Sequence, residues 1–188
     1  MCISKNATDG YAVLKAVEAV LYFKIQSARK GNITMKKIYG AYGSNLNLYQ
    51  MARRCPFAQI YKTGFVEGYK LTFRRGGYCN IEKAEGEKVP VLLWEITELC
   101  ERALDRYEGY PSFYVKENIA VVTEDGEEDV MFYIMSDTER GGYELPSVYY
   151  YQTVKDGYED NALPMEYLET AFEECKAEVM KNMPNGGK

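Results

Sequence analysis

The fold of this chain is decided by one stretch, Ile38-Tyr39-Gly40-Ala41-Tyr42-Gly43-Ser44-Asn45-Leu46. Residues 38–42 predict a short buried strand. Residues 45–54 predict a helix that ends before Pro56, because the residue before a proline avoids helical angles. Gly43 lies between the two, where a glycine permits a tight turn and lets a ligand approach the backbone closely. The stretch therefore predicts a strand–turn–helix unit.

The turn of this unit has two interpretations. In the first, the free backbone N–H groups that open the helix attract a carboxylate or an oxyanion. In the second, the turn is only a tight connection, and Ser44 or Asn45 caps the helix. The GxxxxGK[ST] pattern of a nucleotide-binding loop is absent from it. A single Gly-Ser-Asn sequence leaves both interpretations open.

Outward from this unit, strand patterns dominate the middle of the chain. Residues 58–73 contain β-branched and aromatic runs that we expect two glycines to interrupt. Residues 82–88 are expected to form a polar loop before a buried strand at residues 89–96. Residues 114–122 and 130–135 flank a charged turn and predict a β-hairpin.

Helix patterns lie among these strands without strict alternation. Thr97 is a predicted N-cap of a helix that Gly109 ends. Two further helices are predicted near residues 147–156 and over residues 164–180, with a proline at a permitted first-turn position. This order favours a mixed α+β fold, a curled, mostly antiparallel sheet or small barrel with flanking helices, over a doubly wound sheet.

The ends of the chain differ from this central part. Residues 1–34 carry apolar residues at helical spacing and predict an amphipathic N-terminal helical extension that packs on the main domain. The extension is too short and too charged to span a bilayer, and it lacks the layout of a secretory signal. We expect the domain to cover residues 35–183 and residues 184–188 to form a frayed tail.

Composition narrows the functional classes. The chain has 188 residues, the size of one domain, and a net charge of −5, which gives no general attraction to nucleic acid or to anionic membranes. Its five cysteines form no CxxC pair, so neither a disulfide framework nor a zinc site is predicted. Free thiols suit a reducing compartment, and we expect a cytoplasmic protein.

The sequence contains no histidine, which excludes the Ser-His-Asp and Cys-His nucleophile systems and the HExxH metalloproteases. Acid–base chemistry would have to be carried by a carboxylate, a lysine or a tyrosine. The eighteen tyrosines suit a pocket that binds a polar small molecule through hydroxyl groups. The alternative is that most of them lie at the boundary between core and surface.

Glu108 is the carboxylate that we single out. It is predicted at the C-terminal end of a helix, where the helix dipole disfavours an ionised carboxylate, and partial burial there would raise its pKa toward that of a general base. The alternative is a solvated helix face. Asp105 lies three residues earlier on the same face, so an acid–base pair of the glycosidase type is a lesser alternative.

These fragments become specific in combination. Three blocks in this order resemble the γ-glutamyl cyclotransferase superfamily, which includes γ-glutamylcyclotransferase, γ-glutamylamine cyclotransferase and the avirulence-induced-gene-like proteins. The first block is Tyr39 to Leu46 with Arg54-Cys55-Pro56-Phe57-Ala58; the second is Leu93 to Ile96 with Leu104 to Gly109 and Tyr114; the third is Pro146-Ser147 and Tyr150 with Asn161 to Tyr167. The resemblance implies a barrel-like α+β fold, in agreement with the pattern of elements.

The resemblance also implies a reaction. The α-amine of a γ-glutamyl amino acid or γ-glutamylamine attacks its own γ-carbonyl, which gives 5-oxoproline and releases an amine. Glu108 would be the general base of this reaction, no cofactor or metal would be needed, and the partner would be a small-molecule γ-glutamyl substrate bound by a monomer or homodimer. The substrate-binding residues implied are Tyr42, Gly43, Ser44, Asn45, Leu46, Tyr114 and Tyr150.

Several assignments stay open at this point. The protein could instead be a tailoring enzyme that removes a γ-glutamyl group in a biosynthetic pathway, or a non-catalytic module that binds γ-glutamyl metabolites. In the run Tyr149-Tyr150-Tyr151 the third tyrosine assignment is ambiguous by one position. We expect Cys55 to be a small buried core residue, and the pairs Arg53-Arg54 and Arg74-Arg75 to form solvated faces.

Overall fold

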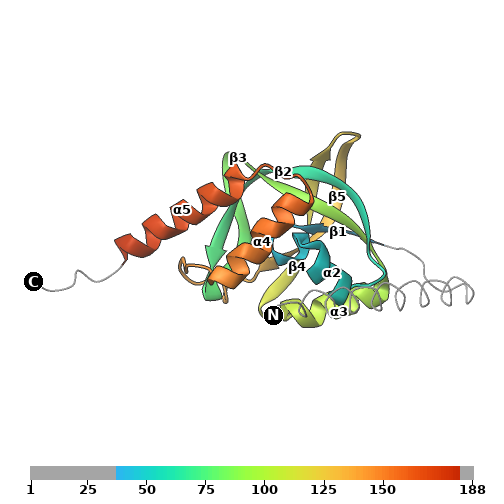
Figure 1. Cartoon of the computed structure of the whole chain (residues 1–188), viewed down its shortest axis with the longest axis horizontal. Coiled ribbons are helices and arrows are strands. Elements are labelled where there is room, and N and C mark those ends of the chain that lie inside the picture. The colour runs from blue at the N-terminus through green and yellow to red at the C-terminus, as the bar shows by residue number, and fades with distance from the viewer. Residues whose placement is uncertain (1–36, 183–188) are drawn as a thin grey trace, which may run out of the picture. The chain divides into compact units, whose positions relative to one another are not determined.

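The structure, a computed structural model, describes residues 37–182. The predicted extension over residues 1–34 and the predicted tail over residues 184–188 lie outside the described residues. Figure 1 shows the order of the elements, which are β1 (Lys37–Ala41), the 3₁₀ turn η1 (Ser44–Leu46), α2 (Leu48–Arg54), β2 (Gln59–Arg74), the 3₁₀ turn η2 (Arg75–Gly77), β3 (Tyr78–Ile96), α3 (Glu98–Glu108), β4 (Tyr114–Thr123), β5 (Gly126–Met135), α4 (Val148–Asp160) and α5 (Glu166–Lys181).

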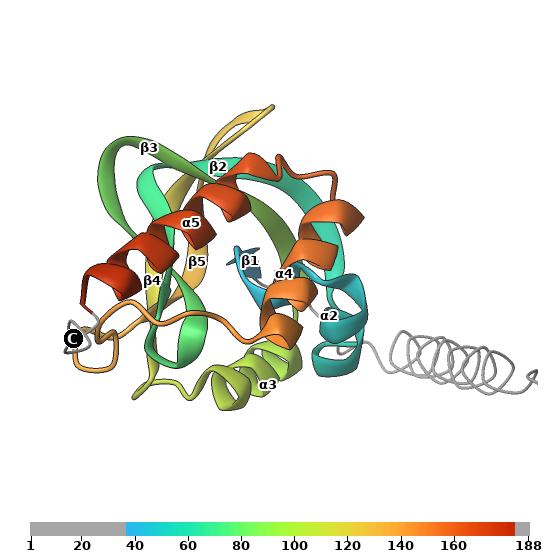
Figure 2. The ribbon, with the colours of Figure 1, turned by 60° about the vertical axis from the view of Figure 1, so that its left-hand side comes forward.

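The strands form a closed barrel in the order β1-β3-β2-β4-β5. β1 pairs with β5 in parallel, through Tyr39 and Met131, and every other pairing in the barrel is antiparallel. The expectation of a mixed, mostly antiparallel small barrel with flanking helices is confirmed. In Figures 1 and 2, α4 and α5 lie across one side of the barrel, and α3 lies along its lower edge in both views.

The long hairpin of β2 and β3 corrects two predictions. The polar loop predicted over residues 82–88 has the wrong bounds, because the whole range lies inside the 19-residue strand β3. Glu82, Lys83 and Lys88 pair with β2, and only residues 84–87, at the register shift, have no partner in that ladder. Gly64 does not interrupt β2 but pairs with Val91. Gly68, with φ 74°, lies at a register shift of the ladder, as a β-bulge does. A neighbouring strand supplied backbone partners that the polar composition alone did not reveal.

The helix after the decisive stretch begins later than predicted. The 3₁₀ turn η1 occupies residues 44–46, ahead of α2. The N-cap of α2 is Asn47, whose side chain accepts a hydrogen bond from Gln50 N–H. Neither Ser44 nor Asn45 caps α2, which leaves both side chains available to other partners. The helix predictions at the C-terminal end hold with shifted bounds, since α4 extends to Asp160 and α5 begins after Pro164.

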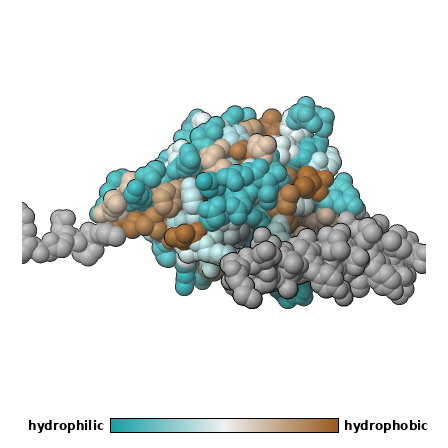
Figure 3. Space-filling model, in the orientation of Figure 1, coloured by the Kyte–Doolittle hydropathy of each residue, from teal (hydrophilic) through white to brown (hydrophobic). Residues whose placement is uncertain are grey.

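The barrel core explains why β1 carries a glycine. A Cβ atom on Gly40 would lie 2.1 Å from the ring of Phe132, which is fully buried. Only a glycine lets β1 pass this close to the core ring. Cys55 is buried, as expected from the sequence. On the face that Figure 3 shows, hydrophilic residues predominate and hydrophobic ones lie in small separate patches.

We find no helix within residues 37–182 with the length and apolar content that a bilayer crossing requires.

Candidate active site

A cavity opens where the ends of several elements meet. The turn after β1, the C-terminal end of α3 and the starts of β3, β4 and α4 all contribute residues to it. Its lining residues are Tyr39, Tyr42, Gly43, Ser44, Asn45, Cys79, Glu108, Tyr114, Tyr133 and Tyr150. We call this space the inner chamber. Its walls are mostly tyrosine rings, and Glu108 contributes the carboxylate.

Glu108 is the last residue of α3, which Gly109 ends in the left-handed conformation at φ 65°. The prediction of this helix from Thr97 to Gly109 is confirmed. Burial of the carboxyl group raises the pKa of Glu108 to about 7, while a hydrogen bond from Asn45 and the charge of Arg54 act in the opposite direction. A carboxyl group with this pKa is a base and an acid at neutral pH.

Asn45 holds this carboxylate. Its Nδ2 donates to Glu108 Oε1 at 2.8 Å and to the hydroxyl of Tyr39 at 2.8 Å. Its Oδ1 accepts from Arg54 Nη1 at 2.6 Å, and its backbone carbonyl accepts from Trp94 Nε1 at 3.2 Å. Because the amide oxygen faces a guanidinium, the amide nitrogen has to face the glutamate.

Arg54 contradicts the prediction of a solvated face. Its Nη2 donates to the hydroxyl of Tyr107 at 2.6 Å, its Nη1 donates to Ser44 Oγ at 3.1 Å, and its guanidinium carbon lies 3.7 Å from the Tyr107 ring centroid. Across the described residues it makes no ion pair. Arg53 points elsewhere, toward Tyr49, because neighbouring positions on a helix lie about 100° apart.

Three predicted tyrosines line the inner chamber, and their hydroxyl groups contact backbone. Tyr42 donates to the carbonyl of Tyr133 at 2.5 Å, and Tyr114 donates to the carbonyl of Cys79 at 2.8 Å. Tyr150 instead accepts a hydrogen bond from Cys79 N–H at 3.1 Å. Burial raises the pKa of all three well above the usual value, so each stays protonated at neutral pH.

Among the predicted substrate-binding residues, Leu46 does not line the inner chamber. Its side chain is fully buried in the core, while its carbonyl accepts from Asn161 Nδ2. The ambiguous tyrosine run is resolved in the structure, since Tyr150 lines the chamber, Tyr149 is exposed and Tyr151 packs against Phe172. Gly43 has a steric reason to be a glycine, because a Cβ there would lie 3.2 Å from the Tyr150 hydroxyl oxygen.

The alternative acid–base partner, Asp105, does not line the chamber. It accepts a hydrogen bond from the Tyr133 hydroxyl at 2.5 Å and lies 2.6 Å from Lys116 Nζ. Lys116 also pairs with Glu101. These contacts hold α3 against β4 and β5, so Asp105 fixes the helix that carries Glu108.

Sequence reasoning missed four residues that line or support the chamber, namely Tyr39, Arg54, Cys79 and Tyr133. The first block of the resemblance includes Arg54, next to Cys55-Pro56, and this block could have indicated Arg54 as a site residue. Cys79 contacts Tyr150 and Tyr114 through its backbone N–H and carbonyl, and a residue type in the sequence does not predict backbone contacts.

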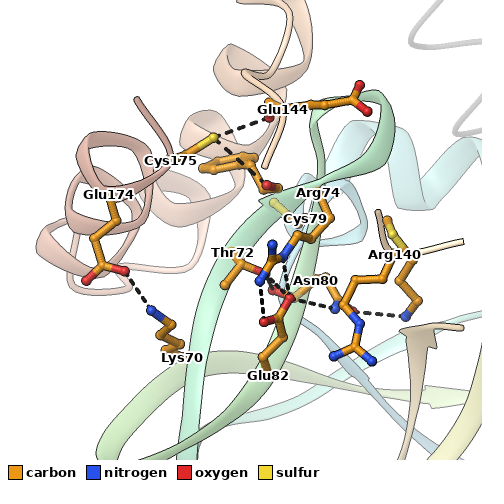
Figure 4. Close-up of polar contacts among 12 residues, drawn as sticks. Lys70, Thr72, Arg74, Cys79, Asn80, Glu82, Arg140, Glu144, Glu174 and Cys175 are labelled. Atoms are coloured by element: carbon orange, nitrogen blue, oxygen red, sulfur yellow. Dashed lines mark hydrogen bonds and ion pairs between the residues drawn. The ribbon is translucent and has the colours of Figure 1, made fainter. Parts of the chain in front are cut away.

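A polar cluster lies near Cys79 on β2 and β3, as Figure 4 shows. Arg74 Nε and Nη2 lie 2.5 Å and 2.6 Å from the carboxylate oxygens of Glu82. Asn80, which is buried, accepts from the backbone N–H of Met135 through its Oδ1 and ties β3 to β5. The prediction of a solvated face is therefore wrong for Arg74, whereas Arg75 is half-exposed and pairs with Glu139.

A second hollow adjoins the inner chamber on its solvent side. It is lined by Ser44, Tyr78, Arg106, Tyr107, Glu108, Gly109, Phe113, Tyr114 and Tyr150. Four of these residues also line the inner chamber, which places Glu108 where the two spaces meet. We call this second hollow the outer chamber.

Comparison with known proteins agrees with this geometry. A family model described as gamma-glutamyl cyclotransferase, AIG2-like, matches residues 39–152, a range that includes every residue lining the inner chamber. Human gamma-glutamylcyclotransferase is 30% identical over 144 residues, which cover 70% of this chain and 75% of the relative; the mouse protein of the same name is 31% identical with the same coverage.

A solved structure of a gamma-glutamyl cyclotransferase has a TM-score of 0.63 with 29% sequence identity, over 81% of this chain and 92% of the other. The likeness therefore extends from the sequence blocks to the arrangement of the barrel and its helices. The chain belongs to the gamma-glutamyl cyclotransferase, AIG2-like family.

Proposed function

We propose that this protein converts a γ-glutamyl amino acid or γ-glutamylamine to 5-oxoproline and releases the amine, with Glu108 as the general base. The observation that carries the proposal is a buried carboxyl group with a pKa of about 7 at the junction of two chambers. The names of the human and mouse relatives support cyclotransferase chemistry.

The reaction needs protons to move from the attacking nitrogen to the leaving nitrogen. The substrate α-amine is protonated at neutral pH and has to lose that proton before its nitrogen can attack the γ-carbonyl carbon. The nitrogen then forms a new C–N bond that closes a five-membered ring and gives up a second proton, the γ-amide C–N bond breaks, and Glu108 delivers a proton to the leaving nitrogen. Because the attack is intramolecular, positioning contributes more than a strong nucleophile would.

The inner chamber offers groups for the glutamyl end. The first hydrogen bond of η1 runs from Leu46 N–H to the carbonyl of Gly43, so the amides of Ser44 and Asn45 are not used within the turn and suit a substrate carboxylate. The hydroxyl protons of Tyr42 and Tyr114 are donated to backbone carbonyls.

Tyr150 differs from these two tyrosines. Its hydroxyl accepts from an amide, and its other neighbour is the Cys79 thiol, a weak acceptor, so its proton suits the substrate carbonyl. Of the three predicted tyrosines, Tyr150 is therefore the one whose hydroxyl proton suits the substrate.

The test measures 5-oxoproline release from γ-glutamyl-alanine, γ-glutamyl-ε-lysine, a γ-glutamyl-polyamine and glutathione by wild type, Glu108→Gln and Glu169→Gln. Glu169 is exposed on α5 and serves as a matched control. We expect at least one substrate to turn over and Glu108→Gln to lose roughly 10²–10⁴-fold in rate. Full activity of Glu108→Gln would end the assignment, and binding without turnover by wild type would favour a metabolite-binding module.

A further inference from the structure

A further hollow lies between the strands of the barrel and shares no lining residue with the inner or the outer chamber. Residues 80–83 of β3 line it, and the end of β5 with the loop that follows contributes most of the other lining residues. Its volume is about 540 Å³. Sites for small molecules have volumes of roughly 300–1,000 Å³ and are common in the mouths of β-barrels. We call this space the barrel hollow.

The buried part of the barrel hollow is mostly apolar. Ile81, Ile134 and Met135 are buried, and Val115, which pairs with Ile134 in the β4–β5 ladder, is half-buried. The remaining buried residue, Asn80, already accepts a hydrogen bond from the backbone N–H of Met135. These side chains therefore offer contact to an aliphatic group.

Five charged residues also line the barrel hollow, and three of them have partners within the protein. Arg140 pairs with Asp137, and Glu82 pairs with an arginine of β2, as Figure 4 shows for the second pair. The other two are Lys83 and Glu117, which are exposed. Across residues 37–182, neither of these makes a hydrogen bond or an ion pair. One positive and one negative charge are thus left without a partner at the same hollow.

Tyr69 places these two charges at one face of the strands. It stands directly opposite Lys83 in the β2–β3 ladder, and side chains at opposite positions lie on the same face. Burial and the charge of Glu117 both raise the pKa of Tyr69, so Glu117 lies near its hydroxyl group. Among the described residues, this hydroxyl has no hydrogen-bond partner. The hollow therefore presents a cation, an anion and a free hydroxyl to a ligand.

The separation of the two charges indicates the kind of ligand. Lys83 and Glu117 lie on different strands, too far apart to form an ion pair with each other. In a free amino acid, the ammonium and the carboxylate are bonded to one carbon atom, whereas a short peptide carries them at its two ends. A peptide can contact both side chains, and a ligand with one charge leaves one of them without a partner.

We propose that the barrel hollow binds a short peptide with free ends and aliphatic side chains. Lys83 contacts the carboxylate of the peptide and Glu117 its ammonium group, while the side chains of the peptide pack against Ile81 and Ile134. This site lies outside both chambers, and the inference does not depend on the proposed function.

The experiment compares three probes that share one body and differ in charge, namely leucyl-leucine, leucyl-leucinamide and N-acetyl-leucyl-leucine. The full chain is labelled with ¹⁵N, and each probe is titrated while the backbone amide signals are followed by NMR. The variants are Lys83→Gln and Glu117→Gln, with Glu85→Gln and Lys181→Gln as controls. Glu85 and Lys181 are exposed and do not line the barrel hollow, so they control for the loss of one charge.

We expect leucyl-leucine to shift the signals of Ile81 and Ile134 in a saturable way and to leave those of Gly43 and Gly109, in the two chambers, unmoved. Wild type should bind it roughly fivefold more tightly than either analogue, the scale of one exposed ion pair. Lys83→Gln should bind leucyl-leucine and leucyl-leucinamide equally. Glu117→Gln should do the same for leucyl-leucine and N-acetyl-leucyl-leucine, and both controls should behave as wild type.

Three results would overturn the inference: no saturable shift at Ile81 and Ile134, shifts confined to Gly43 and Gly109, or an analogue that binds wild type as tightly as leucyl-leucine. An equal loss of affinity in the controls would also overturn it. The spectrum of each variant shows whether that variant is folded. Because none of the probes contains a γ-glutamyl group, a failure here leaves the proposed function intact, and a failure of 5-oxoproline release leaves this site intact.

Discussion

Glu108 and Glu82 are two poorly exposed glutamates of the same domain whose pKa values shift in opposite directions. Burial raises the pKa of Glu82 as well, but the Arg74 guanidinium fork, with Thr72 and Asn80, outweighs it and holds that pKa below the usual value. At Glu108 the neutral side-chain amide of Asn45 takes the place of the guanidinium. Burial is then the largest influence on the carboxyl group and raises its pKa to about 7.

The difference lies in how a cation is connected. Arg74 contacts Glu82 directly, whereas Arg54 reaches Glu108 only through the side chain of Asn45. Direct contact fixes the charge of a carboxylate, which suits a structural role. One intervening amide orients the carboxylate and leaves it able to take up and release a proton near neutral pH.

We expect the largest effect when each of the two glutamates is substituted with glutamine, because one variant should lose activity and the other stability. Glu108→Gln should lose roughly 10²–10⁴-fold in the rate of 5-oxoproline release because its proton acceptor is gone, and it should stay folded. Glu82→Gln should keep its kcat when folded but lose about 3 kcal/mol of unfolding free energy, because Arg74 loses its charged partner. Rates and urea denaturation of both variants check this, and a catalytic defect confined to Glu82→Gln would break the comparison.

The pH dependence of stability should have opposite signs at the two sites. The unfolded chain loses the Glu108 proton near pH 4.5, while the folded chain holds it until about pH 7, so this residue lowers stability progressively between those values. Glu82 has the depressed pKa, so its stabilisation is present above the unfolded pKa and is lost as pH falls through the folded pKa.

Glu108→Gln should therefore gain stability relative to wild type as pH rises from 4.5 to 7, by about 3 kcal/mol at most. Urea denaturation at pH 4.5, 6 and 8 measures this gap. A gap that is constant with pH would contradict the raised pKa.

A smaller effect on kcat is expected from substituting Arg54, which acts on Glu108 through the side-chain amide of Asn45. Arg54→Gln removes the contact that orients Asn45 and the positive charge that lowers the pKa of Glu108, so kcat should fall about tenfold and the acidic limb of the pH–rate profile should move to higher pH. A variant that lost only stability, with an unmoved limb, would show that Arg54 has a structural role alone.

The parts that could be predicted from sequence have local causes. The position of Glu108 at a helix end could be predicted because Thr97 and Gly109 mark the two ends of its helix, and the cap geometry of both is local. The hairpin of β4 and β5 follows from the strand patterns on either side of its charged turn. The mixed, mostly antiparallel barrel followed from the family resemblance and from the absence of strict alternation, whereas the order of its strands was not predicted.

The parts that could not be predicted depend on partners distant in sequence. Glu82, Lys83 and Lys88 belong to a strand because they pair with β2, and Arg74 is neutralised by Glu82 on that same strand. Arg54 donates a hydrogen bond to Tyr107, which lies 53 residues away in the sequence. Leu46 belongs to the predicted motif, but its side chain packs in the hydrophobic core. The motif alone does not tell which of its residues line the site and which pack in the core.

The most direct measurement is the pH dependence of kcat/KM for 5-oxoproline release from a γ-glutamyl amino acid, by wild type and by Glu108→Gln. With Glu108 as general base, the wild-type profile should rise with pH to a midpoint near 7, and the residual activity of Glu108→Gln should lack that limb. A wild-type limb between pH 4 and 5, or a limb near pH 7 that persists in Glu108→Gln, would contradict the assignment of this carboxylate.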